Sequence, residues 1–144
     1  MPLIAPHQIK SRKCTEADID RIKKDAREMI SLCHQKHGMY PGGEAVAHSQ
    51  ITNEDPLRFF VTKAGDIIIN PRIINHGEAV ANSPEGCLSM THMPPRLMKR
   101  WKKCTVRFQV IDGSKFKDVE EEVSGHLANI FQHEIQHFFG KYVY

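Results

Sequence analysis

The sequence predicts an α+β fold in which small antiparallel sheets pack around a central C-terminal helix that carries a HExxH motif. Helical periodicity occurs near both ends of the chain, at residues 15–38 and 124–140. Short segments of strand type fill the region between them. A chain of 144 residues is long enough for a real hydrophobic core, and we expect one domain over residues 1–144.

The first predicted helix has a signal at each end. Thr15 can cap its beginning, with Asp18 three residues later, and Gly38 can close its last turn in the left-handed conformation. Apolar residues at helical spacing predict one buried face, made by Ile19, Ile22, Ala26, Met29, Ile30 and Cys33. The residues that follow are rich in glycine and proline, which predicts a loop.

Three segments in the middle of the chain have strand character. They are "LRFFVT" around Phe60, "DIIINP" ending at Pro71, and "CTVRFQVID" from Cys104 to Asp112. The "DGSK" that follows is a hairpin signal, so "FKDVEEEV" is predicted to return as the neighbouring strand. The sheet is therefore expected to be antiparallel in this part.

The last predicted helix begins after Ser124 as its N-cap and ends near Gly140. One stripe of the helix consists of Leu127, Phe131, Ile135 and Phe138, and the other of His126, Ile130, His133 and His137. A helix with two occupied faces is expected in the middle of a fold, with a sheet on one side and a functional site on the other.

The motif "HEIQH" predicts a metal site. His133 and His137 are four residues apart and project from one helix face, with Glu134 beside them as an acid or base. For the third ligand the candidate is Cys87, which follows Gly86 in "SPEGCLSM", because a thiolate binds zinc and ferrous iron strongly. Three protein ligands leave one position open, as in catalytic rather than structural sites.

Net charge, the length of apolar runs and the number of cysteines limit the partners and the compartment that can be expected. A net charge of +3 does not indicate a specific nucleic-acid partner, and the basic run "KRWKK" from Lys99 to Lys103 is read as a solvated strand edge or loop. No apolar run reaches the ~20 residues of a membrane span. Four scattered cysteines suit a reducing compartment. We expect a cytoplasmic monomer that does not enter a membrane.

Three segments carry a resemblance to a known family. "EGCLS" at 85–89 and "QHEIQH" at 132–137 resemble two signature motifs of peptide deformylase, and "GEAVAHSQ" at 43–50 occupies the place of the family's glycine-rich first motif. Weaker similarity at 69–73, 106–116 and 125–141 extends the resemblance over nearly the whole chain.

The resemblance implies an activity and a set of roles. The family removes the formyl group from the N-terminal formylmethionine of nascent polypeptides. One divalent metal, with Fe2+ as the native ion and Zn2+, Ni2+ or Co2+ as substitutes, would be held by Cys87, His133 and His137. Glu134 would move the proton as a metal-bound water attacks the formyl carbon. The Gln50 side chain and the Leu88 backbone N–H would donate to the oxyanion.

The implied partners are the formyl-Met peptides of nascent chains, met close to the ribosome. The residues expected to bind the substrate are Gly43, Val46, Glu85, Gly86 and Ile130. Phe131 and residues 85–97 are further candidates for the methionine pocket.

Four positions depart from the family pattern, namely Ala45, His48, Gln136 and Phe138. Gln136 cannot carry the negative charge of the usual aspartate, and His48 is expected to place a titratable group near the site. The chain stops at Tyr144, soon after the motif. It therefore resembles a minimal form without the C-terminal extension, like those of phages or organelle-derived lineages, and a phage enzyme would act in the host cytoplasm.

Two alternatives compete with this hypothesis. A HExxH protease would take its third ligand from downstream, but the residues after His137 include no His, Glu or Asp. A catalytically weak, deformylase-like peptide-binding module is suggested by the altered first motif. The presence of Gln50, Cys87 and Glu134 argues against that module, because a decayed site would be free to lose them.

Overall fold

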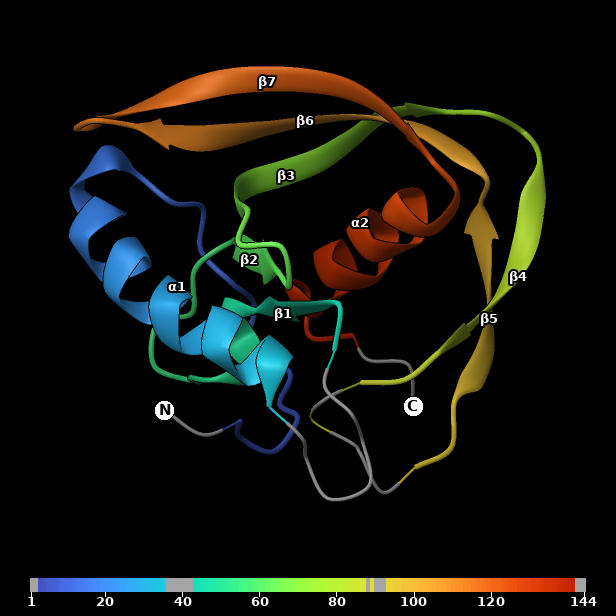
Figure 1. Ribbon diagram of the computed structural model, residues 1–144, viewed down its shortest axis with the longest axis horizontal. Coiled ribbons are helices and arrows are strands. Elements are labelled where there is room, and N and C mark those ends of the chain that lie inside the picture. Colours follow the sequence, from blue (N-terminus) through green and yellow to red (C-terminus); the bar gives the residue numbers. More distant parts are fainter. Residues whose placement is uncertain (1–2, 36–42, 88, 90–92, 142–144) are drawn as a thin grey trace.

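The computed structural model describes residues 3–35, 43–87, 89 and 93–141 and has an α+β architecture (Figure 1). The larger sheet has five antiparallel strands in the order β1 (Ala45–Ala47), β2 (Phe59–Thr62), β3 (Ile67–His76), β6 (Lys103–Asp112) and β7 (Lys115–Ser124). The smaller sheet pairs β4 (Val80–Glu85) with β5 (Arg96–Trp101). The predicted fold class is confirmed.

The last helix, α2 (Gly125–His137), lies between the two sheets. It contacts β1, β3, β6 and β7 of the larger sheet and β5 of the smaller one (Figure 1). The other long helix, α1 (Ile19–His34), contacts β1 and β2. The expectation that the HExxH helix is central is therefore confirmed, and its two occupied faces follow from its two neighbours.

Side-chain alternation in β2 separates two hydrophobic cores. Phe59 and Val61 belong to the core that α1 covers, whereas Phe60, between them, belongs to the core around α2. Successive side chains of a strand point to opposite faces, so three consecutive apolar residues can serve both cores. The Phe60 ring meets that of Phe131 edge to face, with centroids 5.3 Å apart.

The first helix is shorter than predicted. Its entry is a 3₁₀ turn, η1 (Glu16–Asp18), in which the Thr15 backbone N–H donates to Asp18 Oδ2 at 2.8 Å. The helix ends at His34, because Gln35 is already extended with ψ of 149°. Gly38, the predicted terminator, lies outside the described residues.

Strand β3 does not end at Pro71 as predicted, but continues to His76. The pairing of β3 with β6 shifts register between Ile69 and Arg72, and Asn70 in the shift has a φ of 50°. An irregularity of this kind accommodates proline, which cannot donate to the ladder. The Asn70 N–H is satisfied outside the sheet ladder by Arg58 O at 2.8 Å.

The end of α2 is fixed by a close backbone contact. Helical residues stop at His137, and Gly140 three residues later has a φ of +75°. A Cβ at Gly140 would come within 2.8 Å of the Gln8 backbone, so a glycine is required here. Leu127, which the sequence pattern assigned to the apolar stripe, is 42% exposed at the other end of the helix.

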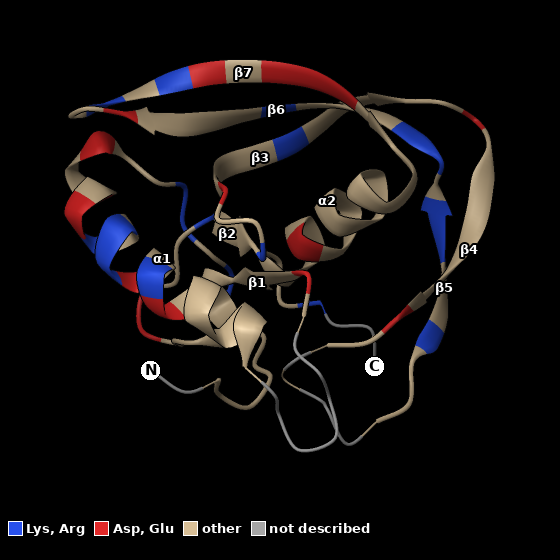
Figure 2. Cartoon of the chain, viewed as in Figure 1, with Lys and Arg blue, Asp and Glu red and all other residues tan. Residues whose placement is uncertain are grey.

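Charged residues gather on β5, β6 and β7, called here the outer strands (Figure 2). Figure 2 shows acidic residues along β7 and basic residues along β5. Between β6 and β7, Arg107 pairs with Glu120 and Lys103 with Glu122, both at 2.7 Å and both exposed. Among the described residues, no helix is long and apolar enough to cross a membrane.

Candidate metal centre

The structure brings together the three side chains that the sequence nominated as ligands. Cys87, His133 and His137 each offer one ligand atom, and these atoms all lie within 4.8 Å of one another. The two histidine Nε2 atoms are 3.1 Å apart, and Cys87 Sγ is 4.0 Å from His137 Nε2. Tetrahedral bonds to zinc would require roughly 3.3 Å between two nitrogens and roughly 3.6 Å between sulfur and nitrogen. The cluster therefore fits one metal ion.

Local structure explains this convergence. His133 and His137 are one turn apart on α2, so their rings stand side by side with centroids 4.8 Å apart. Cys87 comes two residues after β4 ends at Glu85, whose side chain contacts His133 of α2. In the sequence, β5 and the β6–β7 hairpin lie between Cys87 and the two histidines. The third ligand is thus distant in sequence but adjacent in the fold.

Glu85 orients one of the histidines. Its Oε1 lies 2.9 Å from His133 Nδ1, and its two oxygens accept from Arg100 Nη2 at 2.6 Å and Arg100 Nε at 2.9 Å. Burial alone would raise the pKa of Glu85, but the hydrogen bonds from Arg100 and His133 outweigh it and hold this pKa at about 2. An anionic Glu85 keeps the proton of His133 on Nδ1, which leaves Nε2 free to face the ligand cluster.

Arg100 is a residue that sequence reasoning missed. It lies inside the "KRWKK" run predicted as solvated, yet it is only 4% exposed. Its Nη1 also donates to Gln136 Oε1 at 3.0 Å, so the glutamine of the motif holds Arg100 through an uncharged acceptor. Along β5 the side chains alternate, so that Lys99 is exposed and Arg100 is buried. This alternation could have predicted the burial of Arg100 only if the packing of β5 on α2 had been known.

The cluster attracts positive charge. Burial alone would lower the pKa of His133, but hydrogen bonds to Cys87 and Glu85 raise it to about 10. His137, which is fully buried beside His133, has a pKa well below its ordinary value. One of the two histidines is therefore stabilised as a cation and the other as a neutral base. A divalent metal would supply the positive charge in place of that proton.

Glu134 is placed and tuned to exchange a proton. It is 3% exposed, and burial raises its pKa to about 7. Its Oε1 is 3.9 Å from His133 Nε2, and within the described part of the chain its Oε2 has no hydrogen-bond partner. An unsatisfied carboxylate oxygen beside a ligand cluster is suited to a water or substrate atom.

Gln50 points its amide at the cysteine. It ends the 3₁₀ turn η2 (His48–Gln50), and its Nε2 donates to Cys87 Sγ at 3.3 Å and to Ser89 Oγ at 3.2 Å. Its Oε1 accepts the Ala47 backbone N–H at 2.9 Å, which fixes the direction of the amide. Leu88, the other predicted oxyanion donor, lies outside the described residues.

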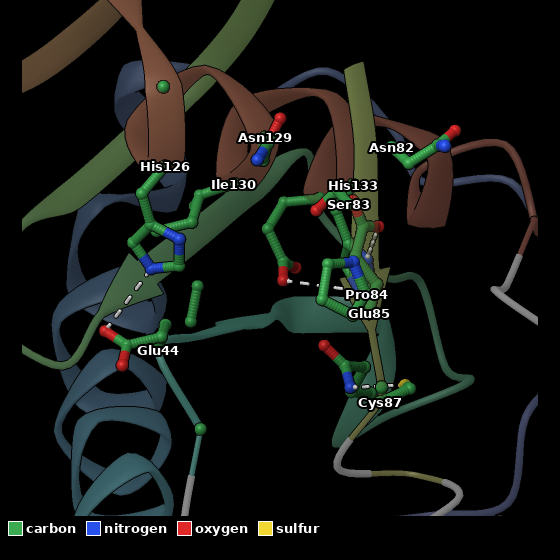
Figure 3. Close-up of a pocket in the computed structure, with 16 residues that line it drawn as sticks. Glu44, Asn82, Ser83, Pro84, Glu85, Cys87, His126, Asn129, Ile130 and His133 are labelled. Atoms are coloured by element: carbon green, nitrogen blue, oxygen red, sulfur yellow. Dashed lines mark hydrogen bonds and ion pairs between the residues drawn. The ribbon is translucent and has the colours of Figure 1, made fainter. Parts of the chain in front are cut away.

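A cavity of about 530 Å³ opens beside these groups (Figure 3). Four of the five predicted substrate-binding residues line it, namely Gly43, Glu85, Gly86 and Ile130. The fifth, Val46, is fully buried in the core under α1 and does not line the cavity. Phe131, a further candidate for the methionine pocket, packs in the core around α2 instead. The side chains of these two residues therefore lie in the hydrophobic cores, and their proposed contact with the substrate stays a prediction.

His48, which was expected near the site, begins the turn that ends at Gln50 but is not among the residues that line the cavity. It is fully buried, and its Nδ1 accepts the Leu57 backbone N–H at 2.9 Å. The proton must therefore sit on Nε2, which donates to Asp25 Oδ2 on α1 at 2.8 Å. The ring also stacks on Phe59, with centroids 4.7 Å apart. His48 joins α1 to the turn that carries Gln50.

Because His48 is buried, we expect the free energy of unfolding to fall in acid. Burial lowers the pKa of folded His48 below its ordinary 6.5, despite the Asp25 hydrogen bond. Below pH 6.5 the unfolded chain binds a proton that the folded chain does not. The contribution of His48 to the free energy of unfolding is therefore complete above pH 6.5 and is lost as the pH falls below it. It amounts to at most about 1.4 kcal/mol per pH unit.

The measurement is urea unfolding between pH 7.5 and 5.0, for the parent and for His48→Gln, which cannot titrate. We expect the variant to lose less stability than the parent over this interval. Equal losses in both proteins would show that His48 is not responsible.

Comparisons with known proteins place the chain in a family. A family model described as polypeptide deformylase matches residues 4–144. The peptide deformylase of Thermotoga maritima is 32% identical over 124 residues, which cover 84% of this chain and 69% of that protein. The peptide deformylase of Erythrobacter litoralis is 39% identical over 122 residues, which cover 85% of this chain and 55% of that protein.

Solved structures agree. The crystal structure of the Thermotoga maritima peptide deformylase superposes with a TM-score of 0.78 at 29% identity, covering 94% of this chain and 86% of that one. A peptide deformylase from a Vibrio parahaemolyticus bacteriophage has a TM-score of 0.79 and covers 99% of this chain and 100% of that one. Its identity of 21% supports the fold alone. With the family model matching nearly every residue, the chain belongs to the peptide deformylase family of enzymes.

Proposed function

We propose that this chain removes the formyl group from the N-terminal formylmethionine of nascent polypeptides, using one divalent metal ion. The observation that carries the proposal is the convergence of Cys87, His133 and His137 beside a cavity that Cys87, His133 and Glu134 line. Three protein donors leave room for a water and for the substrate carbonyl.

The ion would be held by Cys87 Sγ and the two Nε2 atoms of His133 and His137. When bound, it would polarise the formyl carbonyl and lower the pKa of water toward ~7. A sulfur and two imidazoles accept Fe2+, Zn2+, Ni2+ or Co2+, and we propose Fe2+ as the native ion.

Glu134 would serve as the general base and then as the general acid. With a pKa raised by burial to about 7, its carboxylate can take the proton of the attacking water and its acid form can protonate the leaving amine. Its Oε2 atom is available for both steps, because it has no hydrogen-bond partner among the described residues.

Gln50 would stabilise the charge that develops on the formyl oxygen. Its Nε2 lies beside Cys87 Sγ, and its Oε1 is anchored on the Ala47 N–H, so the direction of the amide is already fixed. Donation to the formyl oxygen would take over the hydrogen that Nε2 now donates to Ser89 Oγ. The Leu88 backbone N–H is proposed as the second donor.

The substrate backbone would pair with strand edges. β1 is the terminal strand of the larger sheet and β4 belongs to a sheet of two, and both contribute residues to the cavity. Strand edges bind an extended peptide through its main chain, largely without regard to sequence. Gly43 and Gly86 would allow the peptide backbone to approach closely, and Ile130 would contact the methionine side chain.

We further propose that the substrates are nascent chains close to the ribosome, met by a monomeric protein in the cytoplasm, or in the host cytoplasm if a phage encodes it. The peptide-binding alternative gains no support, because the ligands, the acid/base and the amide donor are all present.

Release of formate from formyl-Met-Ala-Ser, by protein purified anaerobically with ferrous iron, tests the proposal directly. We expect turnover that stops when the metal is chelated and returns when it is restored. A folded, metal-loaded protein that releases no formate would refute the proposed reaction.

Replacing Cys87 with serine tests the ligand set. A hydroxyl is a far poorer ligand than a thiolate, and losing a ligand should exceed the 10- to 100-fold loss of metal affinity that is typical of losing an outer-shell partner. We expect Cys87→Ser to lose its metal during dialysis, measured by elemental analysis. Cys104→Ser is the matched control, because Cys104 is equally buried but lies in the core around α2. Equal metal content in both variants and the parent would remove Cys87 from the set.

A further inference from the structure

The end of the cavity away from the metal ligands is polar. Figure 3 shows Glu44 and His126 facing each other there, apart from His133 and Cys87. Glu44 Oε2 is 3.9 Å from His126 Nε2, and the two side chains are 62% and 70% exposed. This distance is too long for a hydrogen bond, so the carboxylate keeps acceptor capacity for a ligand.

The cavity is a groove along one face of α2. The helix contributes His126, Asn129, Ile130 and His133, which are spaced i, i+3, i+4 and i+7. Seven residues correspond to about 10 Å along the helix. The seven bonds from a formyl carbon to the end of a lysine side chain extend over about 9 Å. A formyl group at the metal ligands therefore allows a long first side chain to reach Glu44 and His126.

The charges in the groove single out Glu44. Of the three carboxylates in its described lining, Glu85 is paired with Arg100 and Glu134 is buried beside His133. Glu44 is the exposed one, at the end where a side chain would terminate. The groove lining also includes the apolar side chains of Ala45 and Ile130, which can contact the methylenes of such a side chain.

We propose that Glu44, assisted by His126, makes the groove accept formyl-peptides whose first side chain ends in a positive charge or hydrogen-bond donor, in addition to methionine. This inference rests on the proposed deformylase function and deepens it. A carboxylate attracts an ammonium group and gains nothing from the methyl group that ends methionine.

The test compares formyl-Lys-Ala-Ser with formyl-norleucine-Ala-Ser, whose first side chain is lysine without the amine. The quantity measured is the ratio of their kcat/KM values. In Glu44→Gln this ratio should fall about 1.5- to fivefold, the range expected for an exposed ion pair. It should fall further in Glu44→Lys, and in the parent it should also fall in 1 M salt, where the screening length is about 3 Å.

Glu122→Gln is the matched control. Glu122 is as exposed as Glu44 but pairs with Lys103 on the outer strands, so the ratio should stay at the parent's value. A ratio that is the same in the parent, Glu44→Gln and Glu44→Lys would overturn the inference, even if formyl-Met-Ala-Ser is turned over normally.

Calorimetry separates this inference from the proposed function. Binding of the same two peptides to Glu134→Gln protein reports the preference without turnover. A lysine preference in binding that depends on Glu44, together with no formate release by the parent, would support the inference and refute the proposed reaction. Equal affinities for the two peptides would refute the inference alone.

Discussion

Replacing Glu134 with glutamine is expected to reduce formate release by about 100- to 10,000-fold, the range for losing a general acid or base. Glutamine has nearly the same shape but cannot take a proton from water or return one to the leaving amine. The metal content should stay at the parent's level, because Glu134 is not among the three clustered ligands.

Stability should not fall in this variant. Burial raises the pKa of Glu134 to about 7, which means that the folded protein disfavours its charged form, and glutamine removes that charge. Elemental analysis, urea unfolding and a formate assay on the same preparation therefore separate catalysis from folding and metal binding.

Glu120→Gln serves as the control, because Glu120 is an exposed carboxylate paired with Arg107 on the outer strands. Turnover by Glu134→Gln at the parent's rate would contradict the role proposed for Glu134. Loss of metal together with activity would indicate that the carboxylate contributes to the ion's binding.

The sequence correctly predicted those features that depend only on residues close together in the chain. His133 and His137 follow from the helical repeat alone, and the β6–β7 hairpin follows from alternation around a turn signal, with Gly113 at a φ of +67°. Cys87 was proposed from the glycine that precedes it and from the affinity of a thiolate for zinc and ferrous iron, and the family resemblance then agreed. In each case the residues that carry the information are neighbours in sequence.

The remaining features depend on contacts between distant segments. Ile130 and Phe131 are adjacent apolar residues, and only the position of the larger sheet decides that Phe131 enters the core while Ile130 lines the cavity. His48 lies in the turn that carries Gln50, but only the position of α1 determines that its partner is Asp25. Periodicity defines the faces of an element without naming what covers each face.

Arg100 is the clearest residue whose burial the sequence pattern did not predict. We also expect substitution of Arg100 to destabilise the fold more than the other substitutions proposed. The side chains of Arg100 and Glu85 are only 3% and 9% exposed, and their atoms approach to 2.6 Å. Arg100→Met would leave Glu85 as a buried charge without its main partner. The free energy of unfolding should fall by about 3–5 kcal/mol, the usual consequence of breaking a buried pair from one side.

The same substitution should weaken metal binding about 10- to 100-fold, because Glu85 would no longer hold the Nδ1 proton of His133 in a fixed direction. Urea unfolding measures the first effect, and competition with a chelator measures the second. Arg107→Met is the matched control, since the Arg107–Glu120 pair is half exposed and should contribute less than about 1 kcal/mol.

A second substitution identifies the cause of the instability. Glu85→Gln removes the stranded charge from the Arg100→Met protein but keeps an oxygen that accepts from His133 Nδ1. The double variant should therefore recover more than half of the lost stability, since most of the cost lies in the unpaired charge rather than in the missing pair. A double variant as unstable as Arg100→Met would instead assign the loss to the packing of the Arg100 side chain against Gln136 and its surroundings.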